Sequence, residues 1–356
     1  MDTIEIKGYK SIQDVKLALR PINILIGANG SGKTNFLSFF EFLRNIYSQN
    51  LRGYVAEKGM EKILHKGAKI TEKISASLSF GKHQYSFNIK VGEAGFVFTN
   101  EELGFGGNLE ESNPMDISSM SYESNLRQAI GTRAQYVREQ LSGLVKYHFH
   151  DTSANSPFTQ TANVETDKFI LYSKGQNLAA ILYNIRETAP VSYNLILHTV
   201  RSIAPFFGDF YLQPQSNGLV RLLWTSRYAE TIYGPTDLSD GTIRFIALAT
   251  LFLQPSLPAT IIVDEPELGL HPAAVTKLAG IMKSVANKGC QIIAATQSAD
   301  LLSHFQPYDI VAVDLVAGAS RFQRLDIDAL QLWLDDYYSL DELWKCSILT
   351  QGQPNI

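Results

Sequence analysis

The stretch INILIGANGSGKTNFLSFF, residues 22–40, constrains the fold more than any other part of the sequence. A short apolar run leads into a loop that carries Gly27, Gly30 and Gly32, and Lys33 and Thr34 then open an apolar helical pattern. The loop matches G-x-x-x-x-G-K-[ST] in the strand, loop and helix context that this pattern needs. Glycines let consecutive N–H groups face one centre, and the helix start adds its positive dipole. The stretch therefore predicts a nucleotide phosphate site in an α/β fold.

The residue types in this loop indicate how ATP and Mg²⁺ would be held. The Lys33 ammonium suits the β and γ phosphates, and the Thr34 hydroxyl suits magnesium. The residues expected to bind the nucleotide here are Gly27, Asn29, Gly30, Ser31, Gly32, Lys33, Thr34 and Asn35.

A pair of carboxylates follows a second apolar run, TIIVDEP at residues 260–266. Asp264 is the expected magnesium ligand, and Glu265 is the expected catalytic residue that orients and deprotonates the attacking water. In open α/β sheets, ligands bind where such strands end. Alone, the pair also fits an ordinary polar strand end, but together with the phosphate loop it favours catalysis, with Lys33 as the second catalytic group.

Another anion-binding pattern, LSDGTIR at residues 238–244, opens an apolar helix. Ser239, Asp240 and Gly241 place a hydroxyl and free backbone N–H groups at the helix start. Taken by itself, the pattern is also explained as a plain helix cap.

The ordered set GANGSGKT, LSDGT, VDEPELGLHP and ATQS resembles the ABC-type ATPases of the SMC/RecF/OLD group, especially the small stand-alone members called AAA-21-like or RecF-like. The resemblance covers residues 1–99 and 235–315. It implies an α/β ABC-ATPase head, a P-loop mixed sheet with an antiparallel N-terminal β-subdomain. The expected ATPase core comprises residues 1–100 and 235–356, and the expected insert is a largely helical lobe with mobile loops at 101–234.

The resemblance also implies a homodimer in which two copies pack head to tail, so that the 238–242 motif of one copy contacts the nucleotide of the other. Glu267 and the LGLHP turn would form the D-loop.

Lys10 and Ser11 in GYKS are weaker nucleotide-binding candidates, because a lysine between two short strands is also typical of a solvated charge. Gln297 replaces the family's switch histidine; an amide can hydrogen-bond a phosphate but cannot carry a proton, so hydrolysis is expected to be slow or differently gated. The sequence does not locate a Q-loop.

Several patterns describe the rest of the chain. Leu126, Ile130 and Ala134 predict one helix of the lobe, and the polar segment 101–119 predicts an exposed loop. His148 and His150 stand next to Asp151 in KYHFHD, a spacing that suits a metal or phosphate but also ordinary packed histidines. Near the end, a capping-box pattern from Ser339 to Glu342 and the aromatic residues Trp333, Tyr337 and Trp344 indicate either a packed tail or a docking surface.

Composition excludes some classes of protein. A net charge of -4 gives no global field that would draw the molecule onto nucleic acid, although a local basic patch is compatible with it. The cysteines, Cys290 and Cys346, indicate neither a disulfide framework nor a zinc site, and no apolar run reaches the length of a membrane span. A cytoplasmic protein without a membrane partner is expected.

The leading hypothesis is an ATP-hydrolysing dimeric switch, the ATPase component of a prokaryotic anti-phage or mobile-element defence system that works with a separately encoded nuclease or toxin. The alternative is a RecF-like DNA repair or recombination ATPase that clamps DNA. A self-contained OLD-type nuclease is disfavoured because the segment after Ser298 is too short for the metal-binding domain it needs. A small-molecule kinase leaves LSDGT unexplained, and a long coiled-coil SMC protein would need heptads that are missing.

Overall fold

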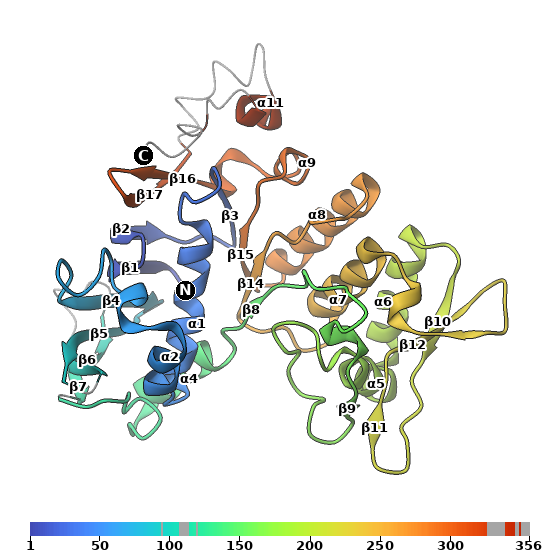
Figure 1. Ribbon diagram of the computed structural model, residues 1–356, viewed down its shortest axis with the longest axis horizontal. Coiled ribbons are helices and arrows are strands. Elements are labelled where there is room, and N and C mark those ends of the chain that lie inside the picture. Colours follow the sequence, from blue (N-terminus) through green and yellow to red (C-terminus); the bar gives the residue numbers. More distant parts are fainter. Residues whose placement is uncertain (94, 107–113, 119, 326–338, 346–348, 350–356) are drawn as a thin grey trace.

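The structure is a computed structural model that describes residues 1–93, 95–106, 114–118, 120–325, 339–345 and 349. Two six-stranded sheets and a lobe lie next to one another along the long axis of the molecule (Figure 1). The sheet nearest the N-terminus is antiparallel throughout, as its alternating apolar residues predict. Its strands, in spatial order, are β2 (Ile12–Ala18), β1 (Thr3–Tyr9), β4 (Lys73–Phe80), β5 (His83–Gly92), β6 (Gly95–Phe105) and β7 (Met115–Ser118).

The central sheet carries the phosphate loop. Its strands are parallel apart from the last hairpin, and β3 and β14 are buried along their whole length, as their continuous apolar runs require. In spatial order the strands are β17 (Ala319–Arg324), β16 (Ile310–Val316), β3 (Ile22–Ile26), β15 (Gln291–Ala295), β14 (Thr260–Asp264) and β8 (Lys146–Tyr147).

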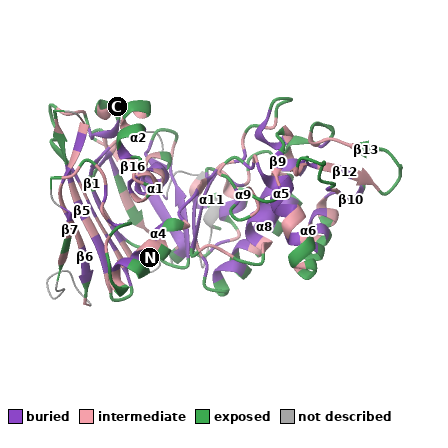
Figure 2. Cartoon of the chain, turned by 90° about the horizontal axis from the view of Figure 1, so that it is seen from below, coloured by how far each residue is buried: buried purple, intermediate pink, exposed green. Residues whose placement is uncertain are grey.

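Alternate residues of the central strands face two separate hydrophobic cores. Leu25, Ile262 and Ile293 join the core that contains the antiparallel sheet, whereas Ile24 and Val263 join the core of the lobe. Buried residues accordingly lie on both sides of the central sheet in Figure 2. The helices of the first core are α1 (Lys33–Tyr47), α2 (Leu51–Lys58), α3 (Met60–Ile63) and α4 (Thr132–Ser142). Those of the second are α5 (Leu178–Thr188), α6 (Pro190–Ile203), α7 (Asp240–Leu253), α8 (Pro272–Asn287), α9 (Ala299–Leu302) and α11 (Leu340–Lys345).

The lobe also contains short strands and single 3₁₀ turns. Small ladders pair β10 with β12, β12 with β13, and β9 with β11. These elements are β9 (Ala162–Asn163), β10 (Phe207–Tyr211), β11 (Leu219–Val220), β12 (Leu223–Ser226), β13 (Ile232–Tyr233), η1 (Pro157–Thr159), η2 (Pro235–Asp237) and, outside the lobe, η3 (Pro307–Asp309).

The chain leaves the antiparallel sheet later than the expected boundary at residue 101. That position lies inside β6, and β7 continues the same sheet, so the predicted exposed loop at 101–119 is partly strand; residues 107–113 and 119 lie outside the described part. The helix predicted from Leu126 and Ile130 begins only at Thr132, and Ile130 is 91% exposed. We propose that the lobe begins after β8 rather than at 101. Along the described ranges, no helix is both long and apolar enough to cross a membrane.

Candidate nucleotide site

The phosphate loop runs from the end of β3 to the first residue of α1. Gly30 and Gly32 adopt left-handed φ values of 78° and 112°. A Cβ atom at Gly32 would overlap the Ser320 hydroxyl, and one at Gly27 would overlap the Val313 carbonyl oxygen. The glycines of the motif are therefore required both by the backbone conformation and by close neighbours.

The Lys33 ammonium lies inside the loop. Lys33 is only 6% exposed. Its Nζ donates hydrogen bonds to the carbonyl oxygens of Gly27 at 2.5 Å and Ala28 at 2.9 Å. Burial lowers the pKa of Lys33, while Glu265 and Asp264 oppose this effect by favouring the charged form. Among the described residues, the buried Ser31 Oγ has no hydrogen-bond partner. A buried ammonium and an orphaned hydroxyl fit a triphosphate in this loop.

Three hydrogen-bonded side chains, those of Ser11, Asn35 and Ser320, connect the phosphate loop to neighbouring elements. Ser320 Oγ lies 2.6 Å from the Ser31 carbonyl oxygen, to which it donates, and 2.7 Å from Ser11 Oγ. Asn35 Nδ2 donates to the same Ser11 oxygen at 2.8 Å. The expected nucleotide contacts Ser11 and Asn35 thus bond to each other under the loop. Ser320, the second residue of β17, carries no sequence signal that would have identified it.

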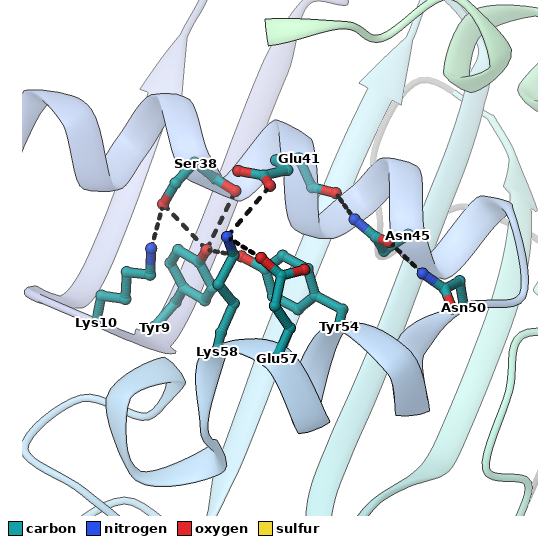
Figure 3. Close-up of polar contacts among 9 residues, drawn as sticks. All are labelled: Tyr9, Lys10, Ser38, Glu41, Asn45, Asn50, Tyr54, Glu57 and Lys58. Carbon is teal, nitrogen blue, oxygen red and sulfur yellow. Dashed lines mark hydrogen bonds and ion pairs between the residues drawn. The ribbon is translucent and has the colours of Figure 1, made fainter. Parts of the chain in front are cut away.

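Lys10 lies beside the second turn of α1 rather than in solvent. Its Nζ donates to Ser38 Oγ at 2.8 Å, within a cluster in which the Tyr9 hydroxyl lies 3.1 Å from Ser38 Oγ and 3.4 Å from the Tyr54 hydroxyl (Figure 3). Burial lowers the pKa of Lys10. In this arrangement Lys10 ties the β1–β2 turn to α1, and its predicted contact with nucleotide stays a prediction.

The two carboxylates lie at the end of β14, next to the phosphate loop. Asp264 Oδ2 is 2.8 Å from the Lys146 Nζ of β8. Glu265 adopts a left-handed φ of 44°, an uncommon conformation for a residue other than glycine, and its Oε1 accepts a 2.8 Å hydrogen bond from Gln297 Nε2. The structure thus brings Lys33, Asp264, Glu265 and Gln297 together, as the sequence predicts. A carboxylate oxygen is the type of ligand that Mg²⁺ takes, so the chemistry of Asp264 fits this ion.

Glu267 ties the D-loop to the segment that carries Gln297. The Thr296 hydroxyl donates to Glu267 Oε1, and the Ser298 N–H donates to that hydroxyl at 2.9 Å. Burial raises the pKa of Glu267, and its Oε2 has no hydrogen-bond partner among the described residues.

The LSDGT motif begins α7, but on the other face of the central sheet from α1. Ser239 Oγ caps the helix by accepting from the Thr242 N–H at 3.3 Å, and both Ser239 and Asp240 are exposed. A Cβ atom at Gly241 would overlap the Gly269 carbonyl oxygen, so the start of α7 packs tightly on the D-loop. Within one chain, the structure does not bring Ser239 to the phosphate loop.

Arg244, one turn into α7, links this helix to two other backbone segments. Its guanidinium donates to the carbonyl oxygens of Phe149 at 3.1 Å, His150 at 2.7 Å and Leu268 at 3.0 Å. Nothing in the sequence marks this residue, because an arginine near a helix start is typical of a solvated charge.

The histidines of KYHFHD lie beside Asp264. Their rings stack at 5.5 Å between centroids, and a His150 ring nitrogen lies 3.2 Å from the Asp264 carbonyl oxygen. Asp151 instead accepts bonds from Ser153. No cluster of metal-binding side chains occurs in the described part of the chain. The residue of KYHFHD that contacts a candidate site residue through its side chain is Lys146, which pairs with Asp264 and was not predicted from the sequence.

The described part of the tail packs against the body. The Ser339 N–H donates to Glu342 Oε2 at 2.8 Å, which confirms the predicted cap, and Leu343 is buried. Trp344 Nε1 donates to the Gln297 carbonyl oxygen at 3.4 Å. Trp333 and Tyr337 lie outside the described residues.

Comparisons with known proteins agree with this geometry. The family model described as "AAA domain, putative AbiEii toxin, Type IV TA system" matches residues 22–303. An OLD nuclease of Thermus scotoductus is 23% identical over 321 residues, which cover 83% of this chain and 58% of that protein. A putative ABC transporter ATP-binding protein of Streptomyces coelicolor is 37% identical over 67 residues, 19% of this chain and 12% of that one. The chain therefore spans only part of each curated relative.

Solved structures of SMC heads share the fold. A head bound to the C-terminal winged-helix domain of ScpA gives a TM-score of 0.62 at 15% identity, covering 92% of this chain and 98% of that one. A Pyrococcus furiosus head with an extended coiled coil, bound to the C-terminal domain of ScpA, gives 0.54 at 15% identity, covering 94% and 98%. The fold shared with SMC heads supports the resemblance to ABC-type ATPases of the SMC/RecF/OLD group. Because the family model spans well over half of the sequence, this chain belongs to that AAA-domain family.

Proposed function

We propose that this chain hydrolyses ATP with Mg²⁺ between two copies packed head to tail, as the ATPase component of a prokaryotic defence system that acts with a separate effector protein. One observation carries the dimeric part of the proposal. The phosphate loop and the exposed start of α7 are both suited to phosphate, yet they lie on opposite faces of one sheet. A second copy would bring the missing α7 start to each nucleotide.

Each half of the proposed site has a chemical role. Lys33 holds the phosphates, and Thr34 and Asp264 hold magnesium, which neutralises phosphate charge when bound. Glu265 accepts a proton from the water whose oxygen forms a bond to the γ phosphorus, while the bond between the β,γ-bridging oxygen and the γ phosphorus breaks, so that ADP and phosphate are left. Gln297 orients Glu265 through their 2.8 Å hydrogen bond. Ser239 and Gly241 of the other copy donate to the γ phosphate.

The defence role is supported by the family description, which names a putative AbiEii toxin and a type IV toxin–antitoxin system. The ScpA-bound SMC heads support the expectation that a fold of this kind works with a separate protein. A nuclease or a toxin is the effector we propose for this chain.

Mixing two inactive variants tests the shared site. Lys33→Ala removes the phosphate lysine, and Ser239→Arg blocks the start of α7; each alone is expected to lose hydrolysis. A mixture should regain activity, because a mixed dimer contains one site with an intact Lys33 and an intact Ser239. Ser202→Arg, at an exposed serine of α6, is the control and should behave as wild type. Full activity of Ser239→Arg, or a mixture that stays inactive although the variants dimerise, would contradict the proposal. ATP-dependent, salt-sensitive duplex binding would instead favour a DNA clamp.

A further inference from the structure

The carboxylate expected to hold magnesium is already paired with a lysine. Lys146 Nζ lies 2.8 Å from Asp264 Oδ2, and the two side chains are only 12% and 10% exposed. Lys146 reaches this position because β8 pairs in parallel with β14, which sets Lys146 opposite Ile262. The pair therefore belongs to the sheet framework and not to a mobile surface contact.

Of the positively charged side chains near Asp264, Lys146 is the one that forms an ion pair with it. Lys33 also interacts electrostatically with Asp264, but its ammonium is hydrogen-bonded to loop carbonyls. Lys10 and His148 add further positive or ionisable groups that interact with Lys146. A carboxylate this far from water is costly unless a cation neutralises it, and removing one partner leaves an uncompensated charge.

We propose that Lys146 is a built-in counter-ion that neutralises Asp264 until magnesium arrives with the nucleotide and displaces it. The inference rests on the proposed function, since it assumes that Asp264 is a magnesium ligand. It has two consequences. Magnesium alone cannot compete with a tethered ammonium at Asp264, and ATP without magnesium still binds because the carboxylate does not repel its phosphates.

Substitutions at Lys146 separate these consequences. Lys146→Met removes the charge and keeps much of the apolar stem, whereas Lys146→Arg keeps the charge. Lys168→Met is the matched control, because Lys168 forms an ion pair of the same 2.8 Å length with Glu165 in the lobe. If Lys146→Met does not fold, Lys146→Gln carries the same expectations, since its amide is neutral and can still donate to Asp264.

The first measurement is the thermal midpoint of the nucleotide-free chain with and without MgCl₂, at matched ionic strength. The midpoint of wild type, Lys146→Arg and Lys168→Met should not respond to magnesium. That of Lys146→Met should be lower without magnesium and rise by several degrees with it, because the bare carboxylate then binds the metal. An equal response in wild type and Lys146→Met, or no response in either, would overturn the inference.

The second measurement is the Kd of a fluorescent ATP analogue in MgCl₂ and in EDTA. Neutralising Lys146 should raise the ratio of the EDTA value to the magnesium value by at least about tenfold, through repulsion between Asp264 and the phosphates. An unchanged ratio would also count against the inference. The first measurement needs neither ATP nor hydrolysis. A chain that does not hydrolyse ATP would contradict the proposed function, and the thermal midpoints would still test the role of the ion pair.

Discussion

Replacing Arg244 with methionine should destabilise the chain and slow hydrolysis together. Arg244 donates to three backbone carbonyls, two at the end of the β8 segment and one in the D-loop. A hydrogen bond from a charged donor contributes about 1.5–3 kcal/mol when its loss leaves the acceptor unpaired. Because Leu268 is exposed and water can replace the bond there, we expect the other two bonds to account for a total loss of about 3–6 kcal/mol in the free energy of unfolding.

Hydrolysis should fall because the D-loop follows Glu265 directly and the β8 segment lies against Asp264. When these segments lose their shared anchor, the positions of both carboxylates become less defined. We expect kcat for phosphate release to drop by at least about tenfold, with a smaller change in KM, since misplacement of catalytic groups costs rate in this range. Urea unfolding and steady-state phosphate release measure the two effects.

Arg201 provides the matched control. It lies in α6, and its Nε donates to the Gly208 carbonyl oxygen at 2.9 Å, with a second contact from Nη2, within the lobe. Arg201→Met should lower stability without changing kcat per folded molecule. If Arg244→Met keeps the wild-type kcat, or if Arg201→Met loses as much rate, the coupling role assigned to Arg244 is refuted.

Three further changes test the site. Gly32→Ala should abolish ATP binding and cost about 1–3 kcal/mol of stability, because its Cβ overlaps Ser320 and its φ is strained; calorimetry that finds normal binding would refute this. Glu265→Gln should lower hydrolysis by about 10²-fold or more yet keep ATP binding, giving a dimer that persists in ATP on size-exclusion chromatography; a monomer would argue against the shared site. Glu267→Gln should stabilise the chain increasingly as pH rises. Burial raises the pKa of Glu267 in the folded state, so the folded chain holds the proton longer and wild-type stability falls with rising pH through that range. Urea unfolding at pH 5 and pH 8 measures the difference in the free energy of unfolding between Glu267→Gln and wild type. A variant that is more stable than wild type only at pH 5 would contradict this expectation.

The sequence was sufficient for the parts of the fold that obey strict periodicity. INILI and TIIVD predict fully buried strands, and both are buried at every residue. The helix predicted from Leu126, Ile130 and Ala134 exists but starts later than predicted: Ala134 is buried in α4, whereas Leu126 is buried in a turn and Ile130 faces solvent. Apolar residues three or four apart indicate a helix only if one backbone segment carries them all, and burial from tertiary packing can mimic that spacing.

For the site, motif spacing predicted residues that the structure places close together, and it missed residues that hold them in position. Lys33, Asp264 and Gln297 meet as expected. Lys146 and Arg244 were missed because their roles depend on which strands and loops become neighbours, and a short edge strand such as β8 leaves no pattern in a single sequence.

The hydroxyl of Ser320 beneath the phosphate loop has a consequence for how the protein matures. Its partner, the Ser31 carbonyl, lies 289 positions earlier. During synthesis, the ribosome completes the glycine-rich loop long before it makes the hairpin of β16 and β17, which carries Ser320. A nascent chain would therefore expose this loop without its Ser320 hydrogen bond until the hairpin of β16 and β17 has been made.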